Sequence, residues 1–210
     1  DLLFAKAKYS AQIGARPVEI GGERKIRIVG GRHPLLDRER CVPLDFTMAH
    51  DAAVREGSYR TAAAAIEAAL SAGRDVAMVN LGDVSVYATA CYVLERIRAD
   101  GFETVMCPGV TSFCAVAARL GRSLTRMDEP LHILPGSTDL DSALALPGTK
   151  VIMKPGKAIQ ETAAALERRG MAANAGMVAD CGLETEQVYT DLRHLPEEVS
   201  YFATILVRSE

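Results

Sequence analysis

Two short loops of the sequence combine glycine, a carboxylate or hydroxyls, and a preceding apolar run. They are Leu81-Gly82-Asp83-Val84-Ser85-Val86-Tyr87 and Pro108-Gly109-Val110-Thr111-Ser112-Phe113. Gly82 would let the backbone approach a ligand closely, and Asp83 could accept hydrogen bonds from a ribose or an amine. Thr111 and Ser112 could contact a ligand or cap the helix that comes next. From the residues alone, an ordinary turn with N-caps explains either loop equally well.

Helix and strand patterns alternate around these loops. Gly73 and Gly121 each follow a helical stretch, as a C′ glycine does. Such alternation predicts a parallel sheet with helices on its faces, and ligands bind such sheets beyond the carboxyl ends of the strands. Both loops therefore lie where a site is expected. The predicted elements are helices over 51–72, 87–99 and 111–120 and strands over 75–81 and 103–107.

The pattern changes after Glu129-Pro130 and predicts a second, mixed α/β lobe. The two lobes would join near residues 121–130. At the start of the chain, residues 1–12 have the pattern of a helix, and Lys25-Ile26-Arg27-Ile28-Val29 alternates like a short strand. The elements predicted for the second lobe are strands over 132–134, 150–153, 176–178 and 202–207 and a helix over 158–169.

Composition places the chain among soluble globular proteins. Hydrophobic residues make up 49% of the 210 residues, so there is enough apolar surface for a core. The formal net charge is -3, so no global positive field would draw the chain to nucleic acid or to an anionic membrane. Neither a membrane span nor a signal peptide is evident, and we expect a cytoplasmic protein.

Several common catalytic motifs are missing from the sequence. It has no G-x-x-x-x-G-K-[ST], G-x-G-x-x-G, H-E-x-x-H or G-x-S-x-G, so P-loop ATP hydrolysis and zinc proteolysis are not expected. The four histidines are scattered, and the five cysteines form no C-x-x-C pair. No metal site is predicted.

Five ordered blocks together resemble the tetrapyrrole methylases. The resemblance runs from about Val42 to the end of the chain. Within the family it is closest to the enzymes that methylate carbon 20 of precorrin-2 or its cobalt form in cobalamin biosynthesis, and the block around Asp83 resembles the branch acting on cobalt-factor II. The blocks are Gly82-Asp83-Val84-Ser85-Val86-Tyr87-Ala88-Thr89, Cys107-Pro108-Gly109-Val110-Thr111-Ser112-Phe113-Cys114-Ala115, Glu129-Pro130-Leu131-His132-Ile133-Leu134-Pro135-Gly136, Lys150-Val151-Ile152-Met153-Lys154 and Tyr201-Phe202-Ala203-Thr204-Ile205-Leu206-Val207.

The resemblance implies a fold, a cofactor and partners. The fold is α/β with two lobes, a parallel sheet in the first and a mixed sheet in the second. S-adenosylmethionine lies between the lobes, the substrate is a tetrapyrrole, and the protein is usually a homodimer. The implied cofactor residues are Leu81, Gly82, Asp83 and Val86 on the methionine and ribose side, Thr111 and Ser112 on the next loop, and Met153, Cys181 and Ala203 near the adenine.

The chemistry implied is an in-line attack of a tetrapyrrole carbon on the sulfonium methyl group. Because the cofactor carries its own leaving group, the protein mainly aligns the two reactants, and no covalent nucleophile is needed. A base must then take the proton from the methylated carbon. Asp83, Tyr87 or His132 could do so directly or through water, and residues 131–135 would face the tetrapyrrole.

The first forty residues depart from the family. Its opening strand and G-x-G-P-G-D loop are missing, and residues 1–40 resemble the segment ahead of the ATPase domain in MutS-like mismatch-repair proteins. The expected divisions are therefore a MutS-like segment over 1–41, a partial first methylase lobe over 42–125 and a second lobe over 126–210. We expect Lys25–Val29 to supply the missing strand, with cofactor affinity and turnover reduced.

Two other functions are consistent with this mixed sequence. One is a non-catalytic chimera that keeps the fold without a competent site. The other is a DNA-associated module acting through the MutS-like segment, which the acidic charge balance disfavours.

Overall fold

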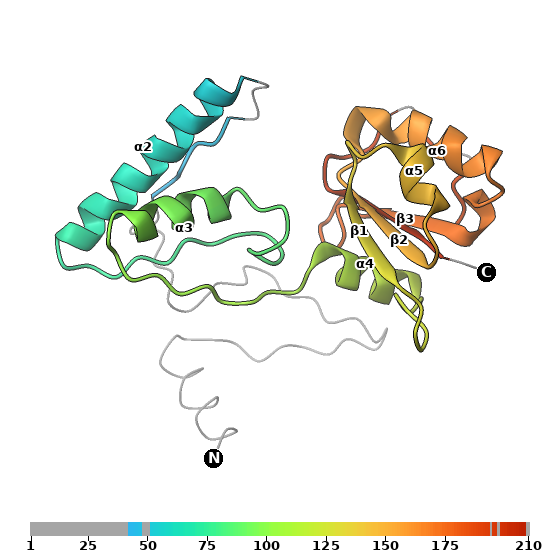
Figure 1. Ribbon diagram of the computed structural model, residues 1–210, viewed down its shortest axis with the longest axis horizontal. Helices are drawn as coiled ribbons and strands as arrows, with labels where there is room; N and C mark the ends of the chain where they lie inside the picture. Colours follow the sequence, from blue (N-terminus) through green and yellow to red (C-terminus); the bar gives the residue numbers. More distant parts are fainter. Residues whose placement is uncertain (1–41, 48–50, 194, 197, 209–210) are drawn as a thin grey trace, which may run out of the picture. The chain divides into compact units, whose positions relative to one another are not determined.

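A computed structural model describes residues 42–47, 51–193, 195–196 and 198–208, with only the backbone of Lys157 (Figure 1). Residues 46–210 form one compact unit. The helix and strand predicted over 1–12 and 25–29, and most of the MutS-like segment, lie outside the described residues. Within the described part of the chain, no helix is both long and apolar enough to cross a membrane.

A five-stranded mixed sheet in the order β1-β2-β5-β3-β4 is the centre of this unit. β1 pairs in parallel with β2, while β5 pairs antiparallel with both β2 and β3. β1, β2 and β3 therefore run in one direction, and their carboxyl ends meet at one edge of the sheet. The strands are β1 Leu131–Pro135, β2 Thr149–Met153, β3 Ala175–Ala179, β4 Gln187–Tyr189 and β5 Ala203–Val207.

Helices cover both faces of the sheet (Figure 1). Phe113 and Ala117 of α4 pack against Val151, Met153 and Leu206 on one face. The other face packs against α5 and α6, and every residue of β2, β3 and β5 is buried. Burial on both faces explains why these strands are nearly continuous apolar runs rather than alternating ones. The helices are α4 Ser112–Leu120, α5 Leu140–Ala145 and α6 Ile159–Arg168, with 3-10 turns η2 Gly156–Ala158 and η3 Ala172–Asn174.

Two further helices, α2 (Ala52–Ser71) and α3 (Ala90–Ala99), pack against each other. The Asp51 carboxylate caps α2 by accepting a hydrogen bond from the Ala53 amide at 2.7 Å. Glu56 of α2 forms an ion pair with Arg96 of α3. The rings of Tyr59 and Tyr92 stack 5.2 Å apart between the two helices.

The α/β fold and the mixed sheet after residue 130 confirm the sequence predictions, whereas the described residues do not form the parallel sheet predicted for the first lobe. The helices predicted over 51–72, 111–120 and 158–169 and the four strands predicted after residue 130 are all present within two residues. Gly73 and Gly121 follow α2 and α4 with left-handed φ values of 72° and 64°. The short α5 and β4 were not predicted, because six and three residues are too few to show a periodicity.

The strands predicted over 75–81 and 103–107 are wrong. Neither segment is a strand, and no described residue before Leu131 belongs to a sheet. Val79 and Val105 are 73% and 77% exposed, although their sequence context is that of a buried strand. A β-rich run becomes a strand only when a neighbouring backbone accepts and donates its hydrogen bonds, and no described segment does this for either run. The helix predicted from Tyr87 likewise starts only at Ala90.

The sheet core should be the main source of stability. Ile205 is fully buried at the centre of β5, so Ile205→Ala should lower the free energy of unfolding by about 3 kcal/mol through lost burial and a residual cavity. Urea denaturation followed by circular dichroism measures this. The control Val105→Ala, at a largely exposed position, should change stability by less than about 0.5 kcal/mol. Equal effects of the two changes would contradict this placement of the core.

Candidate functional site

Asp83 joins the two loops that the sequence singles out. Its Oδ2 accepts a hydrogen bond from the Gly109 amide at 2.8 Å, and its Oδ1 accepts from the Ser85 amide at 2.8 Å and from the Ser85 hydroxyl. The backbones also meet, because a Cβ at Gly109 would lie 2.4 Å from the Gly82 carbonyl oxygen. The loops are thus adjacent, as loops at the ends of neighbouring parallel strands would be.

The hydrogen bonds around Asp83 favour its charged form. The Ser85 hydroxyl, followed by the Gly109 and Ser85 amides, lowers the pKa of the Asp83 carboxyl below its ordinary value. A carboxylate held this way is a weak proton acceptor. The arrangement suits Asp83 to positioning the two loops rather than to general-base chemistry.

The second loop continues into the start of α4, where Thr111 and Ser112 lie. The Thr111 hydroxyl is buried and has no hydrogen-bond partner within the described part of the chain, and it does not cap α4. The Ser112 hydroxyl lies 3.4 Å from the Thr204 hydroxyl of β5, which donates to it. A buried hydroxyl without a partner is costly, so the Thr111 hydroxyl has unused hydrogen-bonding capacity.

Met153 and Ala203 lie together at the carboxyl edge of the sheet. Met153 pairs in register with Thr204, and the Lys154 amide donates to the Ala203 carbonyl at 3.0 Å. The Met153 side chain is in the same apolar cluster as Phe113 of α4, and Val86 of the first loop packs against that cluster. The structure therefore brings Val86, Ser112, Met153 and Ala203 to one end of the sheet.

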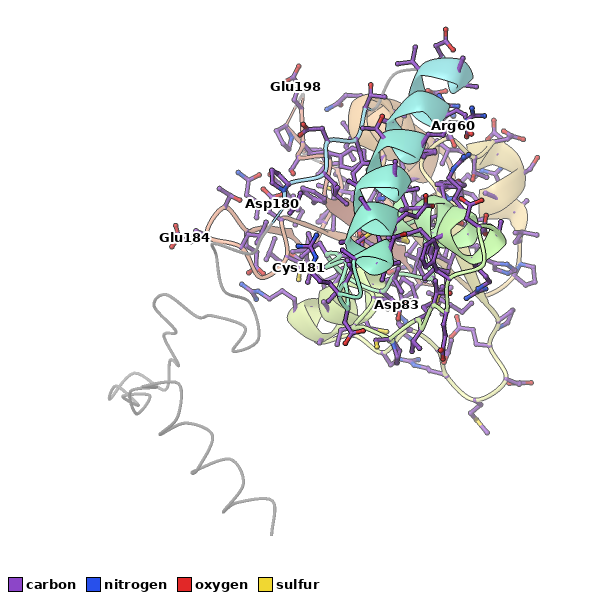
Figure 2. All side chains as sticks on the ribbon, turned by 90° about the vertical axis from the view of Figure 1, so that its left-hand side faces the viewer. Arg60, Asp83, Asp180, Cys181, Glu184 and Glu198 are labelled. Atoms are coloured by element: carbon purple, nitrogen blue, oxygen red, sulfur yellow. The ribbon has the colours of Figure 1, made fainter. Side chains whose placement is uncertain are left out.

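Cys181 lies on the loop directly after β3, beside Asp180 (Figure 2). Burial, followed by the charge of Glu186, raises the pKa of the Cys181 thiol, which keeps it protonated. The Asp180 Oδ2 accepts from the Thr185 hydroxyl at 2.8 Å, and its Oδ1 accepts from the Ser200 hydroxyl. Asp180 thus fastens this loop to the segment that leads into β5.

Tyr87 and Lys154 form a reciprocal link between the first loop and the sheet. The Tyr87 hydroxyl donates to the Ile133 carbonyl of β1 at 3.1 Å, and the Lys154 Nζ donates to the Tyr87 carbonyl at 3.0 Å. Tyr87, Lys154 and Asp180 all have a positive φ, of 47°, 55° and 52°. Each such residue costs about 1–2 kcal/mol, and strain of this kind concentrates at functional sites.

Two of the predicted site residues, His132 and Leu81, do not lie with the residues at the carboxyl edge of the sheet. The Nε2 of His132 lies 2.9 Å from the Pro147 carbonyl oxygen, near the amino ends of β1 and β2 and thus at the other end of the strands from Met153. Leu81 is 70% exposed and makes none of the contacts that join the loops.

Sequence reasoning missed Lys154 and Asp180. Each directly follows the carboxyl end of a buried strand, β2 or β3, and these two strands run in the same direction. Ligand-binding groups in α/β proteins commonly lie at the carboxyl ends of strands. The signal was present as a charged residue at the end of an apolar run, followed by Pro155-Gly156 or by Cys181-Gly182. No group of three or more metal-ligating side chains occurs in the portion that the structure describes.

Fold and site define an α/β protein whose loops gather at the carboxyl edge of its parallel strands. The sequence model of the tetrapyrrole (corrin/porphyrin) methylases matches residues 26–196, and the chain belongs to this family. The family consists of methyltransferases that use S-adenosylmethionine, so the predicted enzyme class and cofactor are confirmed. The match starts upstream of Val42 and so includes part of the segment assigned to residues 1–41.

Two curated relatives have related names. The cobalt-precorrin-2 C(20)-methyltransferase of Salmonella typhimurium (strain LT2) is 30% identical over 170 residues, which are 79% of this chain and 71% of the relative. The precorrin-2 C(20)-methyltransferase of a Sinorhizobium species is 29% identical over 152 residues, 71% of this chain and 62% of the relative. A third match, 43% identical over 51 residues, is to the endonuclease MutS2 of Clostridium acetobutylicum and covers 24% of this chain and 6% of that protein.

Solved structures confirm the fold. A cobalt precorrin-4 methyltransferase superposes with a TM-score of 0.58 at 16% identity, over 71% of this chain and 70% of the other. The uroporphyrin-III C-methyltransferase of Thermus thermophilus, in a complex with S-adenosylhomocysteine, superposes with a TM-score of 0.52 at 19% identity over 72% of each chain.

The link from Asp83 to Gly109 should depend on pH. Because the pKa of Asp83 is lowered in the folded protein, its contribution is complete above the ordinary carboxyl pKa of about 3.9 and is lost as the pH falls through the lower, folded value. The Gly109 amide proton shift, followed by NMR, should titrate with a midpoint below that ordinary value. Asp83→Asn should abolish this titration. A midpoint at or above the ordinary value would contradict the hydrogen-bond arrangement.

Proposed function

We propose that this chain transfers the methyl group of S-adenosylmethionine to carbon 20 of precorrin-2 or its cobalt form. The names of the curated relatives support this substrate class, and the joined loops at the sheet edge support a cofactor site. The observation that carries the proposal is the buried Thr111 hydroxyl beside those loops, which lacks a partner among the described residues. The two lobes over 42–125 and 126–210, a homodimer and a cytoplasmic location are parts of the same proposal.

The residues at the site fit the cofactor. A partnerless buried hydroxyl at Thr111 calls for a polar ligand atom, and the side-chain-free backbone at Gly82 leaves room for close approach. Met153 and Ala203 are buried in the apolar clusters at the end of the sheet, where the family resemblance places the adenine. The proposed cofactor residues are thus Gly82, Thr111, Ser112, Met153 and Ala203, with Leu81, Val86 and Cys181 at the margins of the site.

Catalysis at this site would come from alignment. When bound, S-adenosylmethionine supplies an electrophilic methyl group on a sulfonium that departs as a neutral thioether. The chain holds the loops in register through Asp83 and fixes the first loop to β1 through the Tyr87 hydroxyl. Holding two reactants in line is worth several kcal/mol of the barrier.

The base that removes the final proton is best sought at the sheet edge. Asp83 is engaged by three donors, and His132 lies at the amino ends of the strands. The Tyr87 hydroxyl is at the site and donates its hydrogen to the Ile133 carbonyl, which leaves its oxygen to accept a hydrogen bond from a water that takes the proton to solvent. We propose Tyr87 as the residue that orients this water, with the water as the proton acceptor.

The Thr111 hydroxyl gives a direct test of the cofactor site. Because it has no partner in the described part of the protein, Thr111→Val should leave the free energy of unfolding unchanged or slightly raised. The same change should weaken binding of S-adenosylhomocysteine roughly three- to tenfold, the value of one neutral hydrogen bond. Isothermal titration calorimetry measures the affinity and urea denaturation the stability.

Thr149→Val is the matched control. The Thr149 hydroxyl is also buried, but it donates to Glu129 at 3.1 Å within the protein. Its removal should cost about 1 kcal/mol of stability and leave the affinity unchanged. If the parent chain binds no S-adenosylhomocysteine, the alternative of a non-catalytic chimera replaces the proposal.

A further inference from the structure

Among the described residues, Lys154 is a cation without a carboxylate partner at the carboxyl edge of the sheet. No carboxylate in the described ranges lies within ion-pair distance of its ammonium group. Its Nζ donates to the neutral Tyr87 carbonyl at 3.0 Å and lies 5.4 Å from the centroid of the Tyr201 ring. An ammonium group has three donors, so this arrangement leaves capacity for an anion.

The backbone holds Lys154 in place at an energetic cost. Its φ is 55°, and its amide donates to the Ala203 carbonyl at 3.0 Å. The loop after β1 packs against it, because a Cβ at Gly136 would lie 2.5 Å from the Lys154 carbonyl oxygen. A surface lysine that merely solvates a sheet edge needs no such strained, tightly packed backbone.

We propose that Lys154 binds a carboxylate of the tetrapyrrole substrate and so positions the ring against the cofactor loops. The inference rests on the proposed function. Tetrapyrroles of this class carry acetate and propionate side chains around a flat aromatic or partly reduced ring. An ammonium group beside the partly exposed Tyr201 ring offers such a molecule one charged contact and an adjoining flat apolar surface.

The contacts of Lys154 also explain how substrate and cofactor would be placed together. Met153, the preceding residue, is in the apolar cluster with Phe113 of α4. The Lys154 ammonium meanwhile contacts Tyr87, four residues after Asp83. Met153 and Lys154 are consecutive in the chain, so the residue proposed for the cofactor site directly precedes the residue proposed to bind the substrate.

The test compares Lys154→Met, Lys154→Arg and the parent chain. Binding of uroporphyrin III, which has an acetate and a propionate on each pyrrole ring, is followed by porphyrin fluorescence, and binding of S-adenosylhomocysteine is followed by calorimetry. Lys154→Met should weaken uroporphyrin binding by about tenfold or more and flatten its salt dependence, since one charge-assisted contact is lost. It should change the affinity for S-adenosylhomocysteine less than twofold, and Lys154→Arg should restore most of the porphyrin affinity.

Arg168→Met is the matched control. It removes the same charge from an exposed position in the last turn of α6, and it should leave both affinities unchanged. Coproporphyrin III, which has methyl groups in place of the acetates, should bind the parent chain more weakly and lose less on Lys154→Met.

The outcomes separate the inference from the proposed function. A purely structural role for Lys154 predicts that Lys154→Met lowers both affinities and that salt dependence is retained, which would overturn the inference. Unchanged porphyrin binding in Lys154→Met, or a parent chain that binds S-adenosylhomocysteine but no uroporphyrin III, would also overturn it and leave the cofactor site intact. A parent chain that binds neither ligand would overturn both proposals.

Discussion

The antiparallel pairing of β5 with β2 and β3 is the interaction on which the rest of the structure depends. It sets β2 and β3 parallel to each other without a direct ladder between them, so that their carboxyl ends reach the same edge. Because all three strands are buried on both faces, the register cannot slip without exposing apolar side chains. Met153, Lys154, Asp180 and Ala203 are therefore held at fixed positions at that edge.

Sequence patterns predicted most of the chain from α4 onward, because its strands are apolar runs and because Gly121 and Gly170 follow α4 and α6. They failed at residues 75–81 and 103–107, where the composition is that of strands but the described chain offers no neighbour for pairing. Periodicity reports the tendency of one segment to form a strand, whereas a strand also requires a second segment that pairs with it. The family resemblance located the two loops, yet the positive φ values of Tyr87, Lys154 and Asp180 leave no trace in periodicity.

Electrostatics gives the candidate site two different parts. Around Asp83, amide and hydroxyl donors stabilise the charged carboxylate, and these hydrogen bonds join the two loops. At Lys154, the described chain matches a cation only with a neutral carbonyl and an aromatic ring. A satisfied charge stabilises the protein, while an incompletely matched one is available to a ligand.

The contact of Gly109 with Gly82 restricts how this protein can change over evolutionary time. The obstacle to any side chain at position 109 is the backbone of the other loop, which cannot rotate aside as a flexible side chain could. A substitution there must therefore be accompanied by a change in the path of the loop that carries Asp83. Helix α3 separates the two loops in the chain. Even so, a substitution at Gly109 requires a compensating change in the other loop, so the two loops must change together.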